Sequence, residues 1–219
     1  MRKLLLLASF ILACAPLSFA QTTSDEYDKV EFYGGYSHNR VDTGINNDDP
    51  EFDDIIDERE GFNGFEAAIT GNVHKYVGLK FDVSGAYRSD NFNVGGFSGD
   101  VDSSIYNFLG GVQLKDNRKE GGKVRPFAHF LAGAAHQRVN VDSPNLNALI
   151  GVNSFEADDT SFALGIGGGL DIRVSPRVDI RAIQLDYNPI FTGDQTIQGQ
   201  TFTGETQHNF RIGVGIVIH

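Results

Sequence analysis

Residues 76–88 carry the pattern that decides the fold, with the sequence Tyr-Val-Gly-Leu-Lys-Phe-Asp-Val-Ser-Gly-Ala-Tyr-Arg. Apolar residues alternate here with charged and small ones, and a period of two places the two kinds on opposite faces of a β-strand. Residues 162–173 and 210–219 repeat the alternation. All three segments are at least 10 residues long. They exceed an ordinary strand of ~5–6 residues and match the ~9–11 residues of a tilted membrane-spanning strand.

Five weaker copies of the pattern occupy the rest of the chain, around residues 30–36, 65–73, 106–114, 124–139 and 178–187. In the fourth of these copies, Pro126 and a nearly continuous apolar run blur the phase of the alternation. We assign Arg125 and His129 to its polar face and Phe130 to its apolar face. The sequence therefore predicts eight strands.

Two local irregularities follow from keeping apolar residues on one face. Ile180 and Leu185 share the apolar face only if one extra residue intervenes, which predicts a β-bulge near Ile183-Gln184. Val73 and Val77 share a face only across an odd number of turn residues, which predicts a three-residue turn at 74–76.

The connections between the strands differ in length and in charge. Those at 74–76, 116–122 and 175–177 are short, whereas four long polar ones lie near 42–60, 89–102, 140–159 and 188–206. The long connections hold 18 of the 29 acidic residues and only one basic residue, Arg59. Tight turns at one rim and long loops at the other are typical of an antiparallel up-and-down barrel that crosses a membrane.

The two faces of the strands decide what the barrel wall contacts. The polar face is rich in glycine and in charges of both signs, which suits a narrow interior, and the large apolar residues of the other face suit lipid. A soluble, lipocalin-like barrel with its apolar face inward is the alternative. In the membrane barrel, which has no room for a water channel at eight strands, we expect the charges to pair as a plug. The lumen charge network is Glu66, Lys80, Asp82, Arg125, Asp171, Arg173, Asp179, Arg181 and Arg211.

The first twenty residues have the layout of a cleavable signal peptide. Arg2 and Lys3 precede an apolar run, and Ser18-Phe19-Ala20 offers small residues before the cut. We therefore divide the chain into a signal peptide at 1–20, a short segment at 21–28 and the barrel at 29–219. A lipoprotein cut with a lipidated Cys14 is the alternative. Cys14 is the only cysteine, so the mature chain has no disulfide and no thiolate metal site.

Composition excludes several classes of function. The chain of 219 residues has a formal net charge of −11, which does not fit a protein that binds nucleic-acid phosphates through a basic face. A charged fraction of 21% and an aromatic fraction of 11% do not fit a wholly disordered acidic chain. We expect no cofactor and no nucleic-acid partner.

Residues 29–219 resemble the small eight-stranded outer-membrane β-barrels of the OmpA-barrel and OmpX kind. The last strand is similar to that family's C-terminal insertion signal, with Arg211, Gly213, Ile216 and Ile218 in its slots. The resemblance implies the outer membrane as location, its lipid and lipopolysaccharide as surroundings, the barrel-assembly machinery as a partner during insertion, and a monomer. Two features depart from the family: the chain ends at His219 instead of an aromatic residue, and no peptidoglycan-binding domain follows.

Two possible chemical sites have plainer alternatives. The acidic loop with Asp48, Asp49, Glu51, Asp53 and Asp54 could bind calcium, but its spacing is not that of an EF-hand, and a solvated acidic loop is the better explanation.

A lipid hydrolase would need His136 beside Ser161 and Asp159. Parity places His136 outward and Ser161 inward, so we expect no enzyme.

Two classes of function remain open at this point. The first is a structural or surface-interaction barrel that works through long acidic extracellular loops, with static interior salt bridges. The second is a small pore or transporter for a hydrophobic or ionic solute, in which ion pairs around His129 and Arg125 switch partners as a gate.

Overall fold

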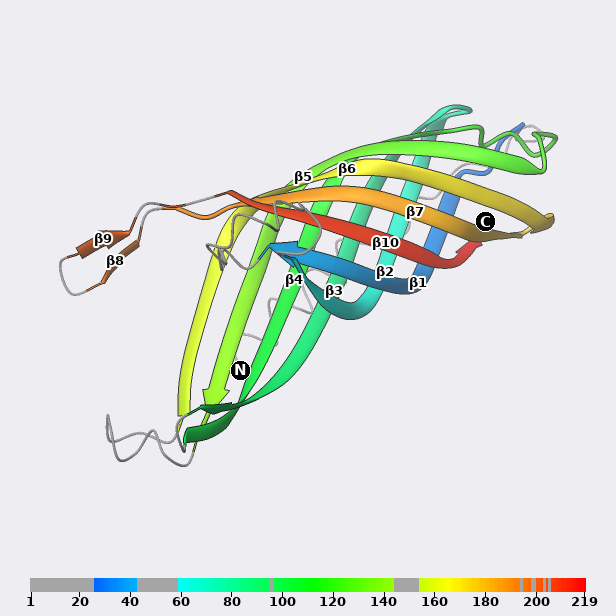
Figure 1. Ribbon diagram of the computed structural model, residues 1–219. Helices are drawn as coiled ribbons and strands as arrows, with labels where there is room; N and C mark the ends of the chain where they lie inside the picture. Colours follow the sequence, from blue (N-terminus) through cyan, green and yellow to red (C-terminus); the bar gives the residue numbers. More distant parts are fainter. Residues whose placement is uncertain are drawn as a thin grey trace, which may run out of the picture.

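The chain forms a closed antiparallel barrel of eight strands, joined in the order β1-β10-β7-β6-β5-β4-β3-β2 (Figure 1). The computed structural model describes residues 26–42, 59–94, 97–143, 154–193, 195–197, 200–202, 204 and 206–219. The predicted signal peptide and the Cys14 alternative lie outside these residues. No helix in the described part is long and apolar enough to cross a membrane.

The strands have unequal lengths. The barrel strands are β1 (Val30–Asp42), β2 (Arg59–His74), β3 (Val77–Val94), β4 (Phe97–Lys115), β5 (Val124–Asp142), β6 (Ser154–Ser175), β7 (Val178–Phe191) and β10 (Thr206–Ile218). The short strands β8 (Gln195–Ile197) and β9 (Gln200–Phe202) pair only with each other. The prediction of eight antiparallel barrel strands is confirmed.

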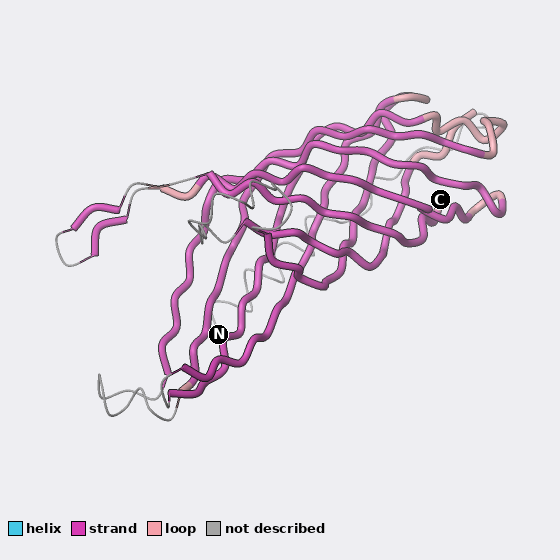
Figure 2. The backbone as a smooth tube through the Cα atoms, in the orientation of Figure 1, coloured by secondary structure: helices cyan, strands magenta, loops and turns pink. Residues whose placement is uncertain are grey.

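Closure of the barrel joins the first strand to the last. Pairs run from Phe32 with Ile218 to Arg40 with Phe210, so every barrel strand has two neighbours. The connections at 75–76, 116–123 and 176–177 lie at the same end as the start of β1 and the end of β10 (Figure 2). We call this end the turn end and the opposite end the hairpin end.

The alternation of the sequence becomes an outer apolar wall and a polar interior. Phe32, Leu79 and Phe130 are each more than half exposed on the outer face, although they are large and apolar. Arg125 and Asp171, which are charged, are completely buried inside the barrel. A soluble barrel has the reverse arrangement, so the lipocalin-like alternative is wrong. The phase assigned to the fifth predicted strand, which is β5, is confirmed.

The predicted bulge is confirmed in β7. Opposite β10, Gly213 pairs with Gln184 and Gly215 with Arg181, so β7 has one more residue than its partner over this stretch. Ala182 and Ile183 are both exposed, and the strand is buried at alternate positions on either side of them. The extra residue keeps charged side chains inside along the whole strand.

The turn at 74–76 differs in detail from its prediction. His74 pairs with Val77 across a two-residue turn, and the register shifts between Asn72 and His74, which leaves Val73 as a bulged residue. The connection between β6 and β7 repeats this solution, with Ser175 paired to Val178. A tight turn plus one bulged residue gives the same odd spacing as a three-residue turn, and Val73 still faces outward.

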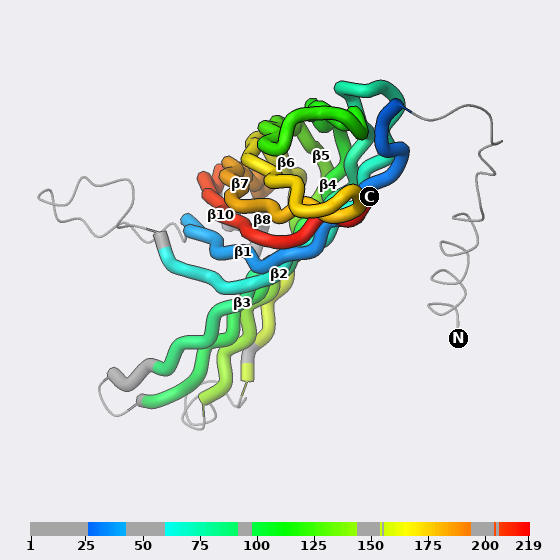
Figure 3. Tube along the Cα trace, turned by 90° about the vertical axis from the view of Figure 1, so that its right-hand side faces the viewer, coloured from blue at the N-terminus to red at the C-terminus, as the bar shows by residue number. Residues whose placement is uncertain are grey.

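The prediction of long loops at 89–102 and 140–159 is wrong for the residues described there. Residues 89–94 pair with 97–102, and residues 140–142 pair with 154–156. Strands β3 to β6 therefore continue together past the rim of the barrel in both views (Figures 1 and 3). We call residues 88–94, 97–103, 137–142 and 154–161 the projecting sheet. Beyond the wall, water contacts both faces, so no apolar alternation marks these residues as strand.

Candidate functional site: the filled interior and the projecting sheet

The centre of the interior holds Arg211, which faces three carboxylates from three strands. Its guanidinium lies 2.6 Å from Asp186, 3.3 Å from Asp82 and 3.6 Å from Glu66. Lys80 adds a second cation, 3.0 Å from Asp82 and 3.4 Å from Glu66. All five side chains are almost completely buried. An unpaired charge at this depth would cost several kcal/mol, so the alternation of signs holds the cluster together.

A second cluster surrounds Arg181, closer to the turn end. Its guanidinium donates to both oxygens of Asp171, at 2.8 and 3.1 Å. The rings of Tyr33 and Phe127 cover it at 4.1 and 4.0 Å from their centroids. This combination of a two-point ion pair with two ring faces is specific to arginine. Lys115 completes the cluster, 3.1 Å from Asp171.

The third cluster closes the mouth of the barrel at the turn end. Arg173 lies 2.8 Å from Asp28 and 3.3 Å from Asp179, and the more distant Arg125 lies 3.8 and 3.9 Å from the same two carboxylates. The ring of His219 points inward and lies 3.0 Å from Asp179. The His219 ring therefore lies among the carboxylates at this mouth.

Amide side chains connect the clusters. Gln184 accepts from Arg181 at 2.7 Å and donates to Glu66 at 2.8 Å and to Asp186 at 2.6 Å. His129 lies 3.0 Å from Asp186, opposite the Arg211 contact. The charged groups thus form a continuous network from the centre to the turn end.

All nine residues predicted for the lumen charge network lie in these three clusters, although Arg173 is partly exposed at the mouth. Sequence reasoning missed several further members: Asp28, Glu31 as a partner of Lys115, Lys115 itself, Asp186 and His219. Asp186 and His219 lie at inward positions of predicted strands, and Lys115 directly follows the predicted strand at 106–114, so extending that strand by one residue would have found Lys115. Asp28 precedes β1 and carries no alternation signal.

The half of the interior towards the hairpin end holds an apolar cluster together with buried uncharged polar side chains such as Ser37, Asn39 and Asn107, and the sequence does not predict this cluster. Leu109, Leu131 and Ile190 are almost completely buried there. The cluster consists of Val41, Phe62, Ala86, Ile105, Leu109, Leu131, Ala135, Ala163 and Ile190. The interior thus holds charge pairs in one half, and apolar side chains with uncharged polar ones among them in the other.

The segment before β1 is held against the turn end. The backbone N–H of Asp28 donates to the carbonyl of Asn117 at 3.0 Å, and that of Lys119 donates to the carbonyl of Glu26 at 3.0 Å. In the same connection, Arg118 donates to both carboxylate oxygens of Asp116, which lowers the pKa of Asp116. These contacts fix the rim at which the chain enters and leaves the barrel.

The four residues of the predicted insertion signal divide between the two faces of β10. Arg211 is buried in the central cluster, whereas Ile216 and Ile218 are about half exposed on the outer wall. A Cβ added at Gly213 would lie 3.4 Å from the Tyr33 hydroxyl, so the interior leaves room there. The recognition of these residues by the barrel-assembly machinery stays a prediction.

The three side chains considered for a hydrolase, His136, Ser161 and Asp159, do not form a catalytic triad. The Nδ1 of His136 lies 2.8 Å from the Thr160 hydroxyl, while the Ser161 hydroxyl donates to Asp159 at 2.5 Å. Ser161 is buried on the opposite face of β6 from Thr160. The candidate calcium loop, with Asp48 to Asp54, lies outside the described residues, and no group of metal-ligating side chains occurs within them.

The edges of the projecting sheet have no neighbours in the described chain. On one side, β2 stops pairing with β3 at Asn63 and Tyr87. On the other, β7 stops pairing with β6 at Phe191 and Phe162. The backbone of residues 154–161 therefore faces outward along one edge, and acidic side chains, among them Glu156 and Asp158, line it. Charges on an edge discourage unselective strand pairing.

Comparisons with known proteins agree with this architecture. Among solved structures, the chain is similar to the attachment invasion locus protein Ail of Yersinia pestis, with 15% identity, a TM-score of 0.50, and coverage of 88% of this chain and 99% of that one. Neisserial surface protein A gives 11% identity, a TM-score of 0.50, and coverage of 86% and 96%. The outer membrane protein OprG of Pseudomonas aeruginosa gives 9% identity, a TM-score of 0.50, and coverage of 88% and 96%. At these identities the likeness shows the fold alone.

A comparison with curated protein sequences gives no match. The family model described as "Outer membrane protein beta-barrel domain" matches residues 6–216, nearly the whole chain. The apolar outer wall, the even number of strands and the charged interior are the features that a barrel in the outer membrane requires. The chain belongs to the outer membrane protein beta-barrel domain family and is an integral protein of the cell outer membrane.

Proposed function

We propose that the barrel is a closed anchor that holds the projecting sheet at the cell surface, where the sheet makes structural or adhesive contacts. The observation that carries this proposal is the contrast between the two parts. The interior is occupied by buried ion pairs, by the apolar cluster and by uncharged polar side chains, whereas four strands continue past the wall with both edges free of barrel neighbours in the described chain. A filled interior suits anchoring, and exposed strands and acidic loops suit contact with a partner.

The surroundings follow from the same proposal. The apolar wall contacts outer-membrane lipid, including lipopolysaccharide in the outer leaflet, and the barrel-assembly machinery acts during insertion. The barrel works as a monomer, because closure leaves no strand edge in the wall for a second copy. We propose no catalytic role, since His136 contacts Thr160 and not Ser161.

The test removes the outer part of the projecting sheet, residues 90–101 and 141–155, and keeps the wall and the base of the sheet. Ser89 pairs with Asp102, and Asn140 pairs with Glu156, so each pair can be joined by an Asn-Gly turn, which favours two-residue hairpins. The trimmed chain should insert and change gel mobility on heating, as the full chain does. We expect cells that produce the full chain to aggregate and to attach to surfaces more than cells without it. Cells that produce the trimmed chain should show neither increase. Equal attachment by cells with the full chain and cells with the trimmed chain would refute a role for the outer part of the projecting sheet.

A second candidate function, passage of a small apolar solute through the wall, is favoured by one feature. Pairing between β6 and β7 is interrupted between the pair Ala163–Ile190 and the pair Ile166–Tyr187. Pro189 lies in this gap and has no backbone N–H to donate. The Asn188 side chain donates to the Leu164 carbonyl instead, at 2.5 Å. The gap adjoins the apolar cluster, which contains Ala163 and Ile190.

Liposome uptake of a small apolar dye distinguishes the two candidates. Passage predicts uptake above that of protein-free vesicles and its loss when Pro189→Val restores the missing donor. A closed anchor predicts uptake equal to that of protein-free vesicles for both chains.

A further inference from the structure

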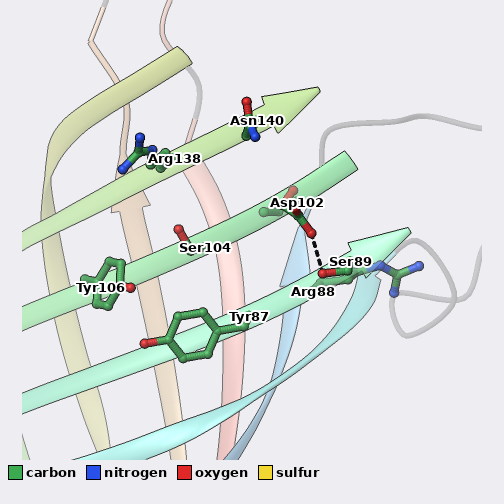
Figure 4. Close-up of a pocket in the computed structure, with 9 residues that line it drawn as sticks. Tyr87, Arg88, Ser89, Asp102, Ser104, Tyr106, Arg138 and Asn140 are labelled. Carbon is green, nitrogen blue, oxygen red and sulfur yellow. Dashed lines mark hydrogen bonds between the residues drawn. The ribbon is translucent and has the colours of Figure 1, made fainter. Parts of the chain in front are cut away.

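A pocket of about 290 Å³ lies where the outer wall meets the projecting sheet, across strands β3, β4 and β5 (Figure 4). Below it, the outer face of β4 carries Phe108 and other apolar residues, and above it the face carries the polar residues Asp100 and Ser98. The pocket therefore lies at the upper edge of the apolar band, at the level of the lipid headgroups. Its volume is at the lower limit of the ~300–1,000 Å³ range of small-molecule sites.

One wall of the pocket is aromatic. The rings of Tyr87 and Tyr106 meet almost at a right angle, with 5.6 Å between their centroids and 81° between their planes. Tyr87 is 42% exposed, so part of its ring surface is available to a ligand. An exposed aromatic face next to polar groups binds molecules that have one apolar face and polar edges.

The other side of the pocket offers hydrogen-bonding groups of both kinds. Asp102 accepts from Ser89 at 2.5 Å and keeps further acceptor sites, Ser104 has a hydroxyl, and Asn140 has an amide (Figure 4). Arg138 supplies donors at the far edge, on β5. Donors and acceptors within one small pocket match hydroxyl groups, because each hydroxyl both donates and accepts.

The charges around the pocket disfavour an anionic ligand. The guanidinium of Arg138 already pairs with Glu156 at 2.5 Å. Arg88 also lines the pocket, but its side chain pairs with Glu60 at 3.2 Å and with Asp90. With Asp102 added, carboxylates outnumber the cations, so a phosphate or sulfate would meet like charge without a free cation.

We propose that this pocket binds an uncharged sugar ring, stacked on the Tyr87–Tyr106 corner and hydrogen-bonded by Asp102, Ser104, Asn140 and Arg138. A pyranose has the required shape, with C–H groups on its faces and hydroxyls around its edge. The ring can come from the headgroup of a glycolipid in the outer leaflet or from a free oligosaccharide. The pocket lies at the base of the projecting sheet, and its lining residues remain when the outer part of the sheet is removed, so this binding can be tested separately from the contacts proposed for the sheet.

The experiment uses the full chain folded in sugar-free amine-oxide micelles, with saturation-transfer NMR as the readout. Methyl β-maltoside is the neutral probe and glucose 6-phosphate the charged one. We expect transfer to the maltoside, with binding weakened about tenfold by Tyr106→Ala, since an aromatic face is lost. Asp102→Ala should weaken it as well. Tyr36→Ala is the matched control, because Tyr36 is an exposed outer-face tyrosine on β1, outside the pocket.

A second arm separates the two sources of sugar. Nanodiscs that contain a monoglucosyl diacylglycerol are compared with nanodiscs of phosphatidylglycerol alone, again with the Tyr106→Ala and Tyr36→Ala chains. Transfer to the glucosyl headgroup without transfer to free maltoside assigns the pocket to a membrane glycolipid, and the reverse result assigns it to a free oligosaccharide.

Three results would overturn the proposal: no transfer to either neutral probe, equal transfer to the wild-type and Tyr106→Ala chains, or stronger binding of glucose 6-phosphate than of the maltoside. The chain trimmed at Ser89–Asp102 and Asn140–Glu156 keeps the lining residues. If the trimmed chain loses attachment but still binds the sugar, the two proposals are shown to concern different parts of the molecule. If it keeps attachment and still binds the sugar, only the proposed function is refuted.

Discussion

Each charged residue of the interior is stabilised by oppositely charged neighbours, and removal of one residue leaves its neighbours without a partner. Asp171 is the case with the sharpest outcome, because it contacts both Arg181 and Lys115. We expect Asp171→Leu to lower the free energy of unfolding by about 3–5 kcal/mol, since two buried cations lose an anion. The double variant Asp171→Leu/Arg181→Met should recover most of the loss, because methionine packs well between the rings of Tyr33 and Phe127. Urea unfolding in lipid vesicles measures both, and a double variant weaker than the single one would contradict this view.

Two glycines of β10 separate packing from recognition during insertion. A Cβ added at Gly215 would lie 2.4 Å from the Gly34 carbonyl oxygen and 2.7 Å from the Tyr33 ring, whereas one at Gly213 has room. We expect Gly215→Ala to destabilise the purified barrel by ~1–3 kcal/mol or more, and Gly213→Ala to refold normally. If Gly213 belongs to an insertion signal, Gly213→Ala should still lower the amount inserted in cells. Normal insertion of Gly213→Ala would remove Gly213 from the signal.

At the scale of elements, the bulge in β7 shows that one residue sets the orientation of half a strand. Deletion of Ala182 shifts one half of β7 by one position, which directs Asp179 and Arg181 or Gln184 and Asp186 into lipid. We expect this deletion to abolish the heat-modifiable gel mobility of the folded barrel. Ala182→Val is the control, because Ala182 faces outward and tolerates a larger apolar side chain. A folded deletion variant would show that the strand can shift its register elsewhere.

At the scale of the whole molecule, the two layers of the interior predict a barrier to ions. The charged network occupies the half towards the turn end, and the apolar cluster lies in the half towards the hairpin end, beside buried uncharged Ser and Asn side chains. We expect no sustained conductance in planar bilayers from the wild-type chain or from Asp82→Ala, since Arg211 keeps Glu66 and Asp186 as partners and the apolar cluster is unchanged. Conductance that appears in Asp82→Ala would favour the gate over static salt bridges.

The sequence by itself determined the barrel and part of the charge network in its interior. Alternation with a period of two assigns each residue of a wall strand to lipid or interior, because only one of the two faces can contact hydrocarbon. That constraint sufficed to place Arg125 and Phe130 despite the blurred phase of β5, and to locate the bulge in β7. Eight of the nine predicted members of the charge network are buried inside, and Arg173 lies partly exposed at the mouth.

Only the tertiary structure decided which charges meet, where the interior becomes apolar, and how far the strands run. Partners such as Arg211 and Asp82 lie on strands that are distant in sequence, and the relative stagger of the strands determines their levels in the barrel. The projecting sheet has water on both faces, so its residues show no alternation of apolar and polar side chains. The sequence pattern therefore predicted loops there. The pocket beside Tyr87 and Tyr106 arises from side chains of three strands that pairing brings together, which no segment of the sequence records by itself.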